Sequence, residues 1–255
     1  MIGDYQGPYN AWPMSVWIGY DPREVDAFAV ARGSLRRHSS INILVYPLIL
    51  AELEKSGVYR RKTLRDGRGL LKDQISNAPM STEFAISRFL TPHMAGPRGW
   101  ALYMDCDMLV RADIAELFAL ADPSKAVMCV KHEHVPDERI KMDAQEQTRY
   151  LRKNWSSVML FNCEHPANRA LSVDLINRVP GRDLHRFCWL SDDLIGELPQ
   201  EWNFLVGYSG DAVGDPKIVH FTNGTPPMIG NRMPFADEWQ EELLRWVRGD
   251  GQFSR

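Results

Sequence analysis

Short apolar runs alternate with amphipathic segments along most of the chain. The runs that predict β-strands cover 15–20, 41–48, 100–104, 126–130, 156–162 and 217–222. Segments with helical spacing lie between them, after residue 21, from 81 to before Pro92, over 111–120 and over 169–179. Because strands and helices alternate, the pattern predicts an α/β fold with an open, mainly parallel sheet. Ligands of such sheets bind at the carboxyl ends of the strands.

Local signals mark two helix starts. Asp21 is followed by Pro22 and Glu24, which predicts Asp21 as the N-cap and Pro22 as the first helical residue. Asp113, with Glu116 three residues later, predicts a second capped start. Near the C-terminus, the helical spacing of Trp239, Leu243, Leu244 and Val247 predicts a helix, for which docking on the core is preferred over contact with a membrane.

Two polar segments have no periodicity. The basic segment 59–72 is interpreted either as a solvated loop or as a contact for an anionic, lipid-linked or phosphorylated acceptor. The segment 131–153 is predicted to be a long functional loop. Within it, His132 and His134 could share one side of an extended chain, but no third metal ligand accompanies them, so an acceptor-side loop is the preferred interpretation.

Composition narrows the class of protein. The chain has 255 residues, 44% of them hydrophobic, and a formal net charge of −3, which argues against a general nucleic-acid binder. Its four cysteines are scattered, so we expect free thiols and a cytoplasmic location. The first residues do not resemble a signal peptide, and no apolar stretch reaches the roughly 20 residues of a membrane span. Peripheral contact with the inner membrane face is left open.

Two carboxylates follow the strand-like run at 100–104. In "YMDCDMLV", Asp105 and Asp107 would project to the same side of an extended backbone, with Cys106 on the other side. Unpaired, the two carboxylates would repel one another, and a divalent cation with oxygen ligands removes that conflict. Such sites are often completed by substrate phosphates. The alternative is that both aspartates only cap a turn.

Arg88 is a second unusual charge. On a helical wheel it shares a face with Phe84, Ala85 and Phe89. A charge in that position needs an anionic partner, from the protein or from a ligand.

Four segments in order, "YMDCDMLV", "NWSSVMLFN", "SDDLIGELPQEWNFLVG" and "VHFTNGTPP", resemble nucleotide-sugar glycosyltransferases of the GT-A fold, in particular the family 8-like group. The similarity runs from about residue 17 to about residue 228. It implies a single GT-A-like domain over 1–255 with a Rossmann-like central sheet. The nucleotide-binding half would cover about 15–130, the donor-sugar and acceptor half about 131–228, and a helical tail 229–255.

The resemblance also implies a metal site. Asp105 and Asp107 would bind Mn²⁺ (or Mg²⁺) and the nucleoside diphosphate, His220 would be the third ligand, and Gly224 would let the backbone approach the diphosphate. A purely structural role is the alternative for His220. Where the family continues to Lys-Pro-Trp, this chain has "TPPM" at 225–228, so Lys153, Arg88 or the metal alone would have to stabilise the leaving group.

The resemblance places further contacts around this metal site. Those expected for the nucleotide are Gly19, Tyr20, Asp21 and Arg23, with the helix cap as the alternative for Asp21. Arg88 would reach the sugar and phosphate, with a buried ion pair as its alternative. Those expected for the donor sugar are Asn154, Ser156 and Ser157, with Trp155 either stacking on the sugar or packing in the core. Asp192 or Asp193 would act catalytically, orienting the donor or stabilising developing positive charge.

The expected activity is transfer of a hexose from a nucleoside diphosphate sugar, with UDP as the expected nucleotide, to an acceptor hydroxyl with retention of configuration. The acceptor would be a glycan, a lipid-linked sugar or a small molecule. One rival is a sugar nucleotidyltransferase, although "WIGYDPRE" lacks the Gly-rich loop expected after the first strand. The other rival is a noncatalytic sugar-nucleotide or glycan-binding protein on the same scaffold.

Overall fold

The central sheet is the main framework of the protein. The structure is a computed structural model that describes residues 14–65, 67, 71–132, 152, 154–210, 214–230 and 232–249. Its main sheet has the strand order β10-β8-β9-β6-β1-β2. These strands are β1 (Ser15–Tyr20), β2 (Leu44–Ile49), β6 (Trp100–Met104), β8 (Val127–Cys129), β9 (Val158–Asn162) and β10 (Ile195–Glu197). β9 alone among them runs antiparallel to its neighbours, which confirms the predicted open, mainly parallel sheet.

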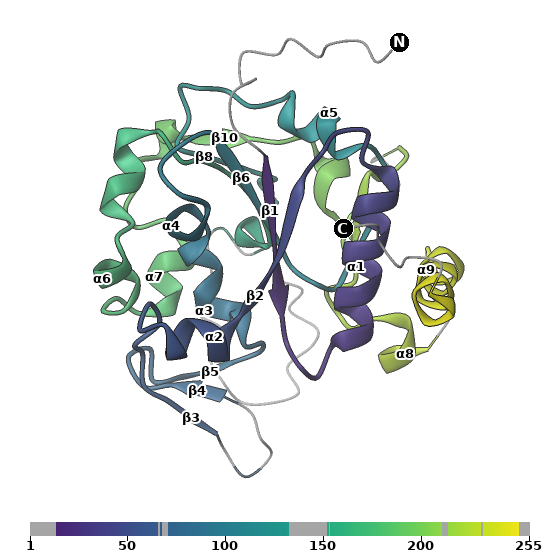
Figure 1. Ribbon diagram of the computed structural model, residues 1–255, viewed down its shortest axis with the longest axis horizontal. Coiled ribbons are helices and arrows are strands. Elements are labelled where there is room, and N and C mark those ends of the chain that lie inside the picture. Colours follow the sequence, from purple (N-terminus) through teal and green to yellow (C-terminus); the bar gives the residue numbers. More distant parts are fainter. Residues whose placement is uncertain are drawn as a thin grey trace.

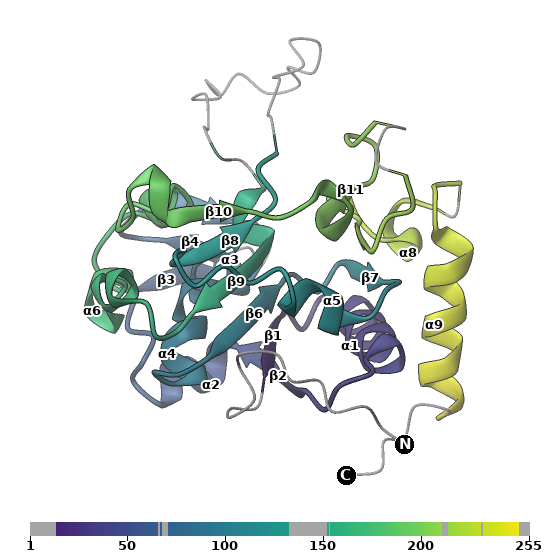
Figure 2. The ribbon, with the colours of Figure 1, turned by 90° about the horizontal axis from the view of Figure 1, so that it is seen from above.

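Helices cover both faces of this sheet (Figures 1 and 2). On one side lie α1 (Val25–His38) and, outside it, α9 (Ala236–Arg248). On the other side lie α3 (Phe84–Ser87), α4 (Thr91–Ala95), α6 (Val173–Ile176) and α7 (Gly181–His185). The shorter α2 (Leu50–Lys55) and α5 (Ile114–Phe118) follow β2 and β7 along the chain. In the part of the chain that the structure describes, none of the helices combines the length and apolar character needed to cross a bilayer.

A second sheet, in the order β11-β12-β7, extends the fold beside α1. Its strands are β7 (Met108–Val110), β11 (Phe204–Leu205) and β12 (Ile218–His220). Val30 of α1, Leu109, Val219 and Trp239 of α9 form a small buried core between these elements. The sequence pattern does not predict β7, because the two aspartates are followed closely by the helical spacing of 111–120. α8 (Pro226–Ile229) follows β12.

A third sheet corrects the interpretation of 59–72 as a basic loop. β3 (Thr63–Arg65), β4 (Leu71–Asp73) and β5 (Ala78–Met80) pair antiparallel. Arg61 is buried, with its Nε 2.9 Å and its Nη2 2.5 Å from the two carboxylate oxygens of Asp73. Its Nη1 donates to the carbonyl oxygens of Ile176 and Val179. Arg61 therefore links this small sheet to the α6 region and is not a solvated loop residue.

Three helix predictions differ in detail from the structure. Asp21 is not the N-cap of α1, since the helix begins at Val25 with Glu24 as its N-cap. The Asp21 carboxylate accepts instead from Arg23 and from the backbone N–H of Glu83, which ties β1 to the start of α3. The helix from 81 gives way to a 3₁₀ turn, η1 (Arg88–Leu90), and Pro92 lies in the first turn of α4, where it leaves no hydrogen bond unmade.

Two other terminal signals match the structure more closely. Asp113 caps α5 by accepting from the backbone N–H of Ala115 at 3.0 Å. In α9 Trp239 is fully buried and Leu243 packs beside it, as predicted, whereas Leu244 and Val247 are exposed. The predicted helix over 169–179 is limited to α6, which follows the 3₁₀ turn η3 (Pro166–Ala170).

Candidate metal and donor site

Strand pairing brings three distant segments to one point. β6 and β9 run antiparallel, so the end of β6 lies beside the start of β9, and the backbone N–H of Asp105 donates to the carbonyl oxygen of Ser157 at 3.0 Å. β7 and β12 also run antiparallel, and the N–H of Phe221 donates to the carbonyl oxygen of Asp107 at 2.9 Å. This pairing carries His220 to the aspartates. Backbone pairing alone therefore brings the two aspartates and His220 together.

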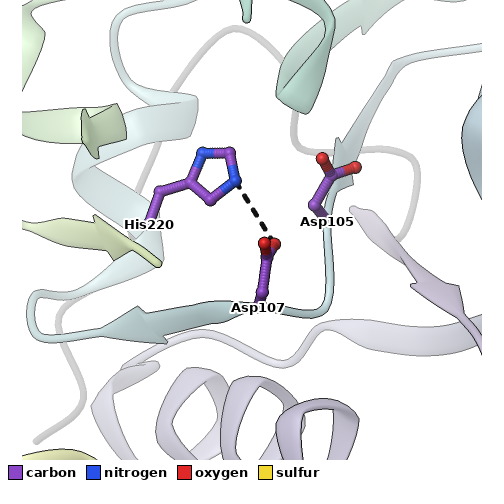
Figure 3. Close-up of side chains that lie close together, drawn as sticks. All are labelled: Asp105, Asp107 and His220. Carbon is purple, nitrogen blue, oxygen red and sulfur yellow. Dashed lines mark ion pairs between the residues drawn. The ribbon is translucent and has the colours of Figure 1, made fainter. Parts of the chain in front are cut away.

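Asp105, Asp107 and His220 offer one ligand atom each, and these atoms all lie within 4.8 Å of one another. Figure 3 shows the three side chains directed toward a common space, with Nε2 of His220 3.3 Å from Oδ1 of Asp107. Two hard oxygen ligands and one imidazole suit a divalent cation such as Mn²⁺. The residues predicted to bind a metal are therefore brought together in a geometry that could hold one.

Asp107 supplies a separate indication that a cation fits this site. Its Oδ1 is buried and, among the described residues, receives no hydrogen bond, having only the ion-pair contact with His220. Burial by itself would lower the pKa of His220, but the carboxylates of Asp107 and Asp105 outweigh burial and raise it. A buried acceptor facing a ring nitrogen leaves the site one positive charge short, and a proton or a metal ion can supply that charge.

Asp105 has partners of its own. Nη1 of Arg88 lies 3.0 Å from its Oδ1, and the Tyr103 hydroxyl donates to the same oxygen at 2.7 Å. Arg88 is only 6% exposed and also donates to the carbonyl oxygen of Ser156 at 2.9 Å. Burial raises the pKa of the Asp105 carboxyl, Arg88 opposes that rise and Asp107 adds to it. The predicted need of Arg88 for an anionic partner is confirmed, and the partner within the chain is Asp105.

The site forms part of a cavity of about 480 Å³, within the usual range of small-molecule pockets. Polar residues from the segment after β6, from the turn before β9 and from the loop after β12 line it. The residues predicted for donor binding that lie on its wall are Arg88, Asp105, Asp107, Asn154, Ser156, Ser157 and Gly224. Gly224 has φ 117°, and an added Cβ would lie 3.1 Å from Cγ2 of Ile229, so this turn of the wall requires glycine.

The residues predicted to contact the nucleotide are placed differently. Gly19, Tyr20, Asp21 and Arg23 are not on the cavity wall. A Cβ on Gly19 would come within 2.5 Å of the Phe84 ring, so this glycine serves the packing of α3 on β1. Asp21 is fully buried and held by Arg23 and Glu83.

Glu24 lines the cavity instead of these four residues. Its Oε2 accepts from the Cys106 thiol at 3.2 Å. Burial and the nearby Asp107 raise the pKa of the Glu24 carboxyl.

The donor-sugar wall begins at Asn154, which has a left-handed backbone at φ 64°. The 3₁₀ turn η2 (Trp155–Ser157) follows, with the Ser156 hydroxyl 2.6 Å from Nδ1 of His185. Desolvation, followed by the charge of Arg88, lowers the pKa of His185 to about 3, so this ring is neutral. The Trp155 ring is half-buried, and its Nε1 donates to the carbonyl oxygen of His132 at 3.0 Å.

The catalytic candidates lie at the edge of this wall. Asp192 and Asp193, in the 3₁₀ turn η4 (Asp192–Leu194), are exposed and do not line the cavity. Asp192 is joined to the wall by its ion pair with Arg152, a lining residue that the sequence interpretation did not single out. Lys153 and His134 lie outside the described residues, and so does most of the segment 131–153.

Besides Arg152, sequence reasoning missed four side chains that shape the site. They are Glu24, Tyr103, His185 and Asn203. Tyr103 and Asn203 each stand next to a motif, in "LYMD" and "EWNF", but they are embedded in apolar runs. A polar side chain buried in such a run must form a hydrogen bond with a partner, and this requirement is the only sign in the sequence that Tyr103 and Asn203 have a special role.

Comparisons with known proteins agree with this fold. The chain resembles WbbM, a bifunctional glycosyltransferase, with 14% identity and a TM-score of 0.59 over 93% of this chain and 50% of that one. It resembles GlyE of Streptococcus pneumoniae TIGR4 with 16% identity and a TM-score of 0.56, over 94% of this chain and 64% of GlyE. A galactosyltransferase, LgtC, in complex with donor and acceptor sugar analogues, matches with 14% identity and a TM-score of 0.53 over 90% of this chain and 95% of its own.

The protein therefore has the fold of the GT-A glycosyltransferases, with a candidate acidic metal site in its cavity. It spans half of the WbbM chain and about two thirds of the GlyE chain. No protein-family model matches the sequence. Protein CDI of Arabidopsis thaliana is 44% identical over 236 residues, covering 91% of this chain and 86% of its own, and the chain belongs to the same family.

Proposed function

We propose that this protein is a metal-dependent glycosyltransferase. In this proposal it moves a hexose from a nucleoside diphosphate sugar, with UDP as the nucleotide, to an acceptor hydroxyl and retains the anomeric configuration, as the family 8-like enzymes do. The observation that carries the proposal is the convergence of Asp105, Asp107 and His220 on the cavity wall of a GT-A fold. A divalent cation held there would neutralise the diphosphate as it leaves the sugar.

The charges around the site favour a metal and a diphosphate together. Three carboxylates, Asp105, Asp107 and Glu24, line the same cavity as the buried guanidinium of Arg88, which pairs with Asp105. With His220 neutral, these four groups sum to −2 when all the carboxylates are ionised and −1 when Glu24 is protonated. A divalent cation brings that sum to zero or above, and the diphosphate then adds the negative charge that the cation and Arg88 can accommodate.

The donor wall fits a polar ligand such as a sugar. Asn154 and Ser156 line the cavity beside the metal residues, and their position supports the proposed contacts with sugar hydroxyls. Arg152 is the cation on this wall that replaces, in the proposal, the Lys of the family's Lys-Pro-Trp segment. Asp192 is the better of the two catalytic candidates because its ion pair connects it with Arg152.

A binding and turnover experiment tests the proposal. Thermal unfolding is followed with UDP, GDP and their hexose derivatives, each with and without Mn²⁺, because a ligand that binds only the folded protein raises its stability. Donor hydrolysis is then measured with the best ligand. The proposal predicts a Mn²⁺-dependent stabilisation by one nucleotide and slow release of the free sugar.

The matched variant is Asp107→Asn, which preserves the shape of the side chain and removes its charge. It should fold as the wild type does and lose both the Mn²⁺-dependent stabilisation and the hydrolysis. Pyrophosphate release from a nucleoside triphosphate and a sugar 1-phosphate would overturn the proposal in favour of a nucleotidyltransferase. Tight binding with no turnover toward water or any acceptor would overturn it in favour of a noncatalytic binding protein.

A further inference from the structure

A buried asparagine stands behind the candidate metal ligand His220. Asn203 ends the 3₁₀ turn η5 (Gln200–Asn203) and is fully buried. Its Oδ1 lies 3.0 Å from Nδ1 of His220. This nitrogen is on the edge of the ring that faces away from Asp107, while Nε2 faces the aspartate (Figure 3). Asn203 therefore contacts the ring only on the side opposite the metal site.

The partners of Asn203 fix the direction of this hydrogen bond. The Ser157 hydroxyl lies 2.7 Å from the carbonyl oxygen of Asn154, which can only accept, so the hydroxyl donates its proton there. The oxygen of the same hydroxyl then accepts from Nδ2 of Asn203 at 2.8 Å. With the amide nitrogen committed to Ser157, the amide oxygen must face His220. An amide oxygen is only an acceptor, so Nδ1 of His220 carries the proton.

A neutral imidazole has one ring proton, so a proton on Nδ1 leaves a lone pair on Nε2. That lone pair faces Oδ1 of Asp107 across 3.3 Å, and Oδ1 receives no hydrogen bond from the described residues. Two electron pairs directed at each other repel. The arrangement is favourable when a cation, either a proton or a metal ion, lies between them. A ligating histidine is usually held by just such a bond from its other nitrogen.

We propose that Asn203 is a positioning residue that holds His220 in the Nδ1–H tautomer and so presents Nε2 to a divalent cation. The proposal rests on the metal-dependent function above. The hydrogen-bond chain from His220 through Asn203 and Ser157 ends at the carbonyl oxygen of Asn154, whose left-handed backbone is part of the donor-sugar wall. These hydrogen bonds thus join the metal ligand to the sugar side of the cavity. The Ser157 hydroxyl donates its proton to the carbonyl oxygen of Asn154 and not to the sugar.

The first test reads the tautomer in the metal-free protein. Two-bond ¹H–¹⁵N correlations of histidine-labelled protein, at a pH where His220 is neutral, distinguish a proton on Nδ1 from one on Nε2. The wild type should show the Nδ1–H form. Asn203→Asp keeps an acceptor at this position and should keep that form. Asn203→Leu removes the acceptor, so the proton should move to Nε2, where Oδ1 of Asp107 can accept it.

The second test measures Mn²⁺ affinity by electron paramagnetic resonance of the free ion. Loss of the partner of a ligating histidine typically costs about 10- to 100-fold in metal affinity, and this is the range expected for Asn203→Leu. Asn203→Asp should stay within a few-fold of the wild type. The matched control is Asn168→Ala, a buried asparagine that donates to two backbone carbonyls near β8 and β9 and does not line the cavity. It should lower stability without changing Mn²⁺ affinity.

The outcomes separate this inference from the proposed function. An Nε2–H form in the wild type overturns the inference whatever the metal does. Equal Mn²⁺ affinity and an unchanged tautomer in Asn203→Leu also overturn it. A wild type with the Nδ1–H form that binds no Mn²⁺ overturns the metal-dependent function and with it the metal-presenting role of Asn203. If Asn203→Leu does not fold, the Asn203→Asp and wild-type spectra decide, because an Nε2–H form in either one contradicts the proposed hydrogen bond.

Discussion

The substitution Arg88→Met should lower the stability of the metal-free protein. It should also increase the stabilisation that Mn²⁺ provides, relative to the wild type. Arg88 is 6% exposed and pairs with the equally buried Asp105 at 3.0 Å. Removing one partner of a buried ion pair typically costs about 3–5 kcal/mol, because the other charge stays buried without compensation. For a chain of this size each kcal/mol corresponds to about 2–4 °C in Tm, so the metal-free variant should melt about 6–20 °C lower.

Mn²⁺ should restore part of this loss. In the variant the carboxylate of Asp105 has no guanidinium beside it, so a divalent cation meets a more negative site and no longer faces the positive charge of Arg88. The rise in Tm on adding saturating Mn²⁺ should therefore be larger in Arg88→Met than in the wild type. Differential scanning fluorimetry with and without Mn²⁺, at fixed protein concentration, measures both shifts.

The chain offers a matched control far from the site. Arg61 and Asp73 form a comparably buried pair, and neither residue lines the cavity. Arg61→Met should lower the Tm by a similar amount, and Mn²⁺ should stabilise it no more than it stabilises the wild type. The reasoning is refuted if Mn²⁺ stabilises Arg88→Met and Arg61→Met equally, because the loss at Arg88 would then be unrelated to a cation at Asp105.

Three further outcomes follow from the same structure. Mn²⁺ and UDP should each tighten the binding of the other by the same factor, as linkage requires, and titration calorimetry of each ligand in the presence of the other measures this; independent affinities would contradict a shared site. Burial raises the pKa of the Asp73 carboxyl, but hydrogen bonds from Arg61 and Ser76 outweigh burial and lower it below its usual value. The contribution of the Asp73 carboxylate to stability is therefore complete above the unfolded pKa of about 3.9 and is lost as the pH falls through the folded pKa. Acid titration should therefore unfold the wild type with an apparent loss of stability below about pH 4 that is weaker in Arg61→Met. Gly19→Ala should cost about 1–3 kcal/mol in denaturant unfolding because its Cβ would meet the Phe84 ring at 2.5 Å, and unchanged stability would show that α3 packs differently on β1.

The sequence predicted the sheet better than it predicted the ends of the helices. Strands such as β6 are continuous apolar runs that only a covered sheet accommodates, and they occur where the pattern placed them. The predicted start of α1 was wrong. Asp21, Pro22 and Glu24 fit the local pattern of an N-cap, but the carboxylate of Asp21 accepts hydrogen bonds from Arg23 and Glu83 instead. A contact with a residue 62 positions away leaves no trace in local spacing.

The residues of the candidate site were likewise predicted only in part from the sequence. Asp105 and Asp107 could be named from the sequence because they stand in a short motif that follows a strand, whereas His220 was named from the family resemblance. The structure brings the three together. Asn203 could not be named, because the pairing of β11 with β12 is what carries it to His220. Tyr103 lies only two residues before Asp105, but it stands inside an apolar run whose pattern is that of core residues. Gly19 and Asp21 were assigned to the nucleotide, whereas their surroundings in the structure are those of packing and an internal ion pair.

The central claim is that a divalent cation binds between the two aspartates and His220 and there meets the diphosphate of an activated sugar. Crystals grown with Mn²⁺ and UDP, with diffraction data collected on the anomalous signal of manganese, test it most directly. The account predicts one strong anomalous peak within coordination distance of Asp105, Asp107 and Nε2 of His220, with the diphosphate oxygens completing the shell. Electron density for UDP with no manganese at these side chains would contradict it.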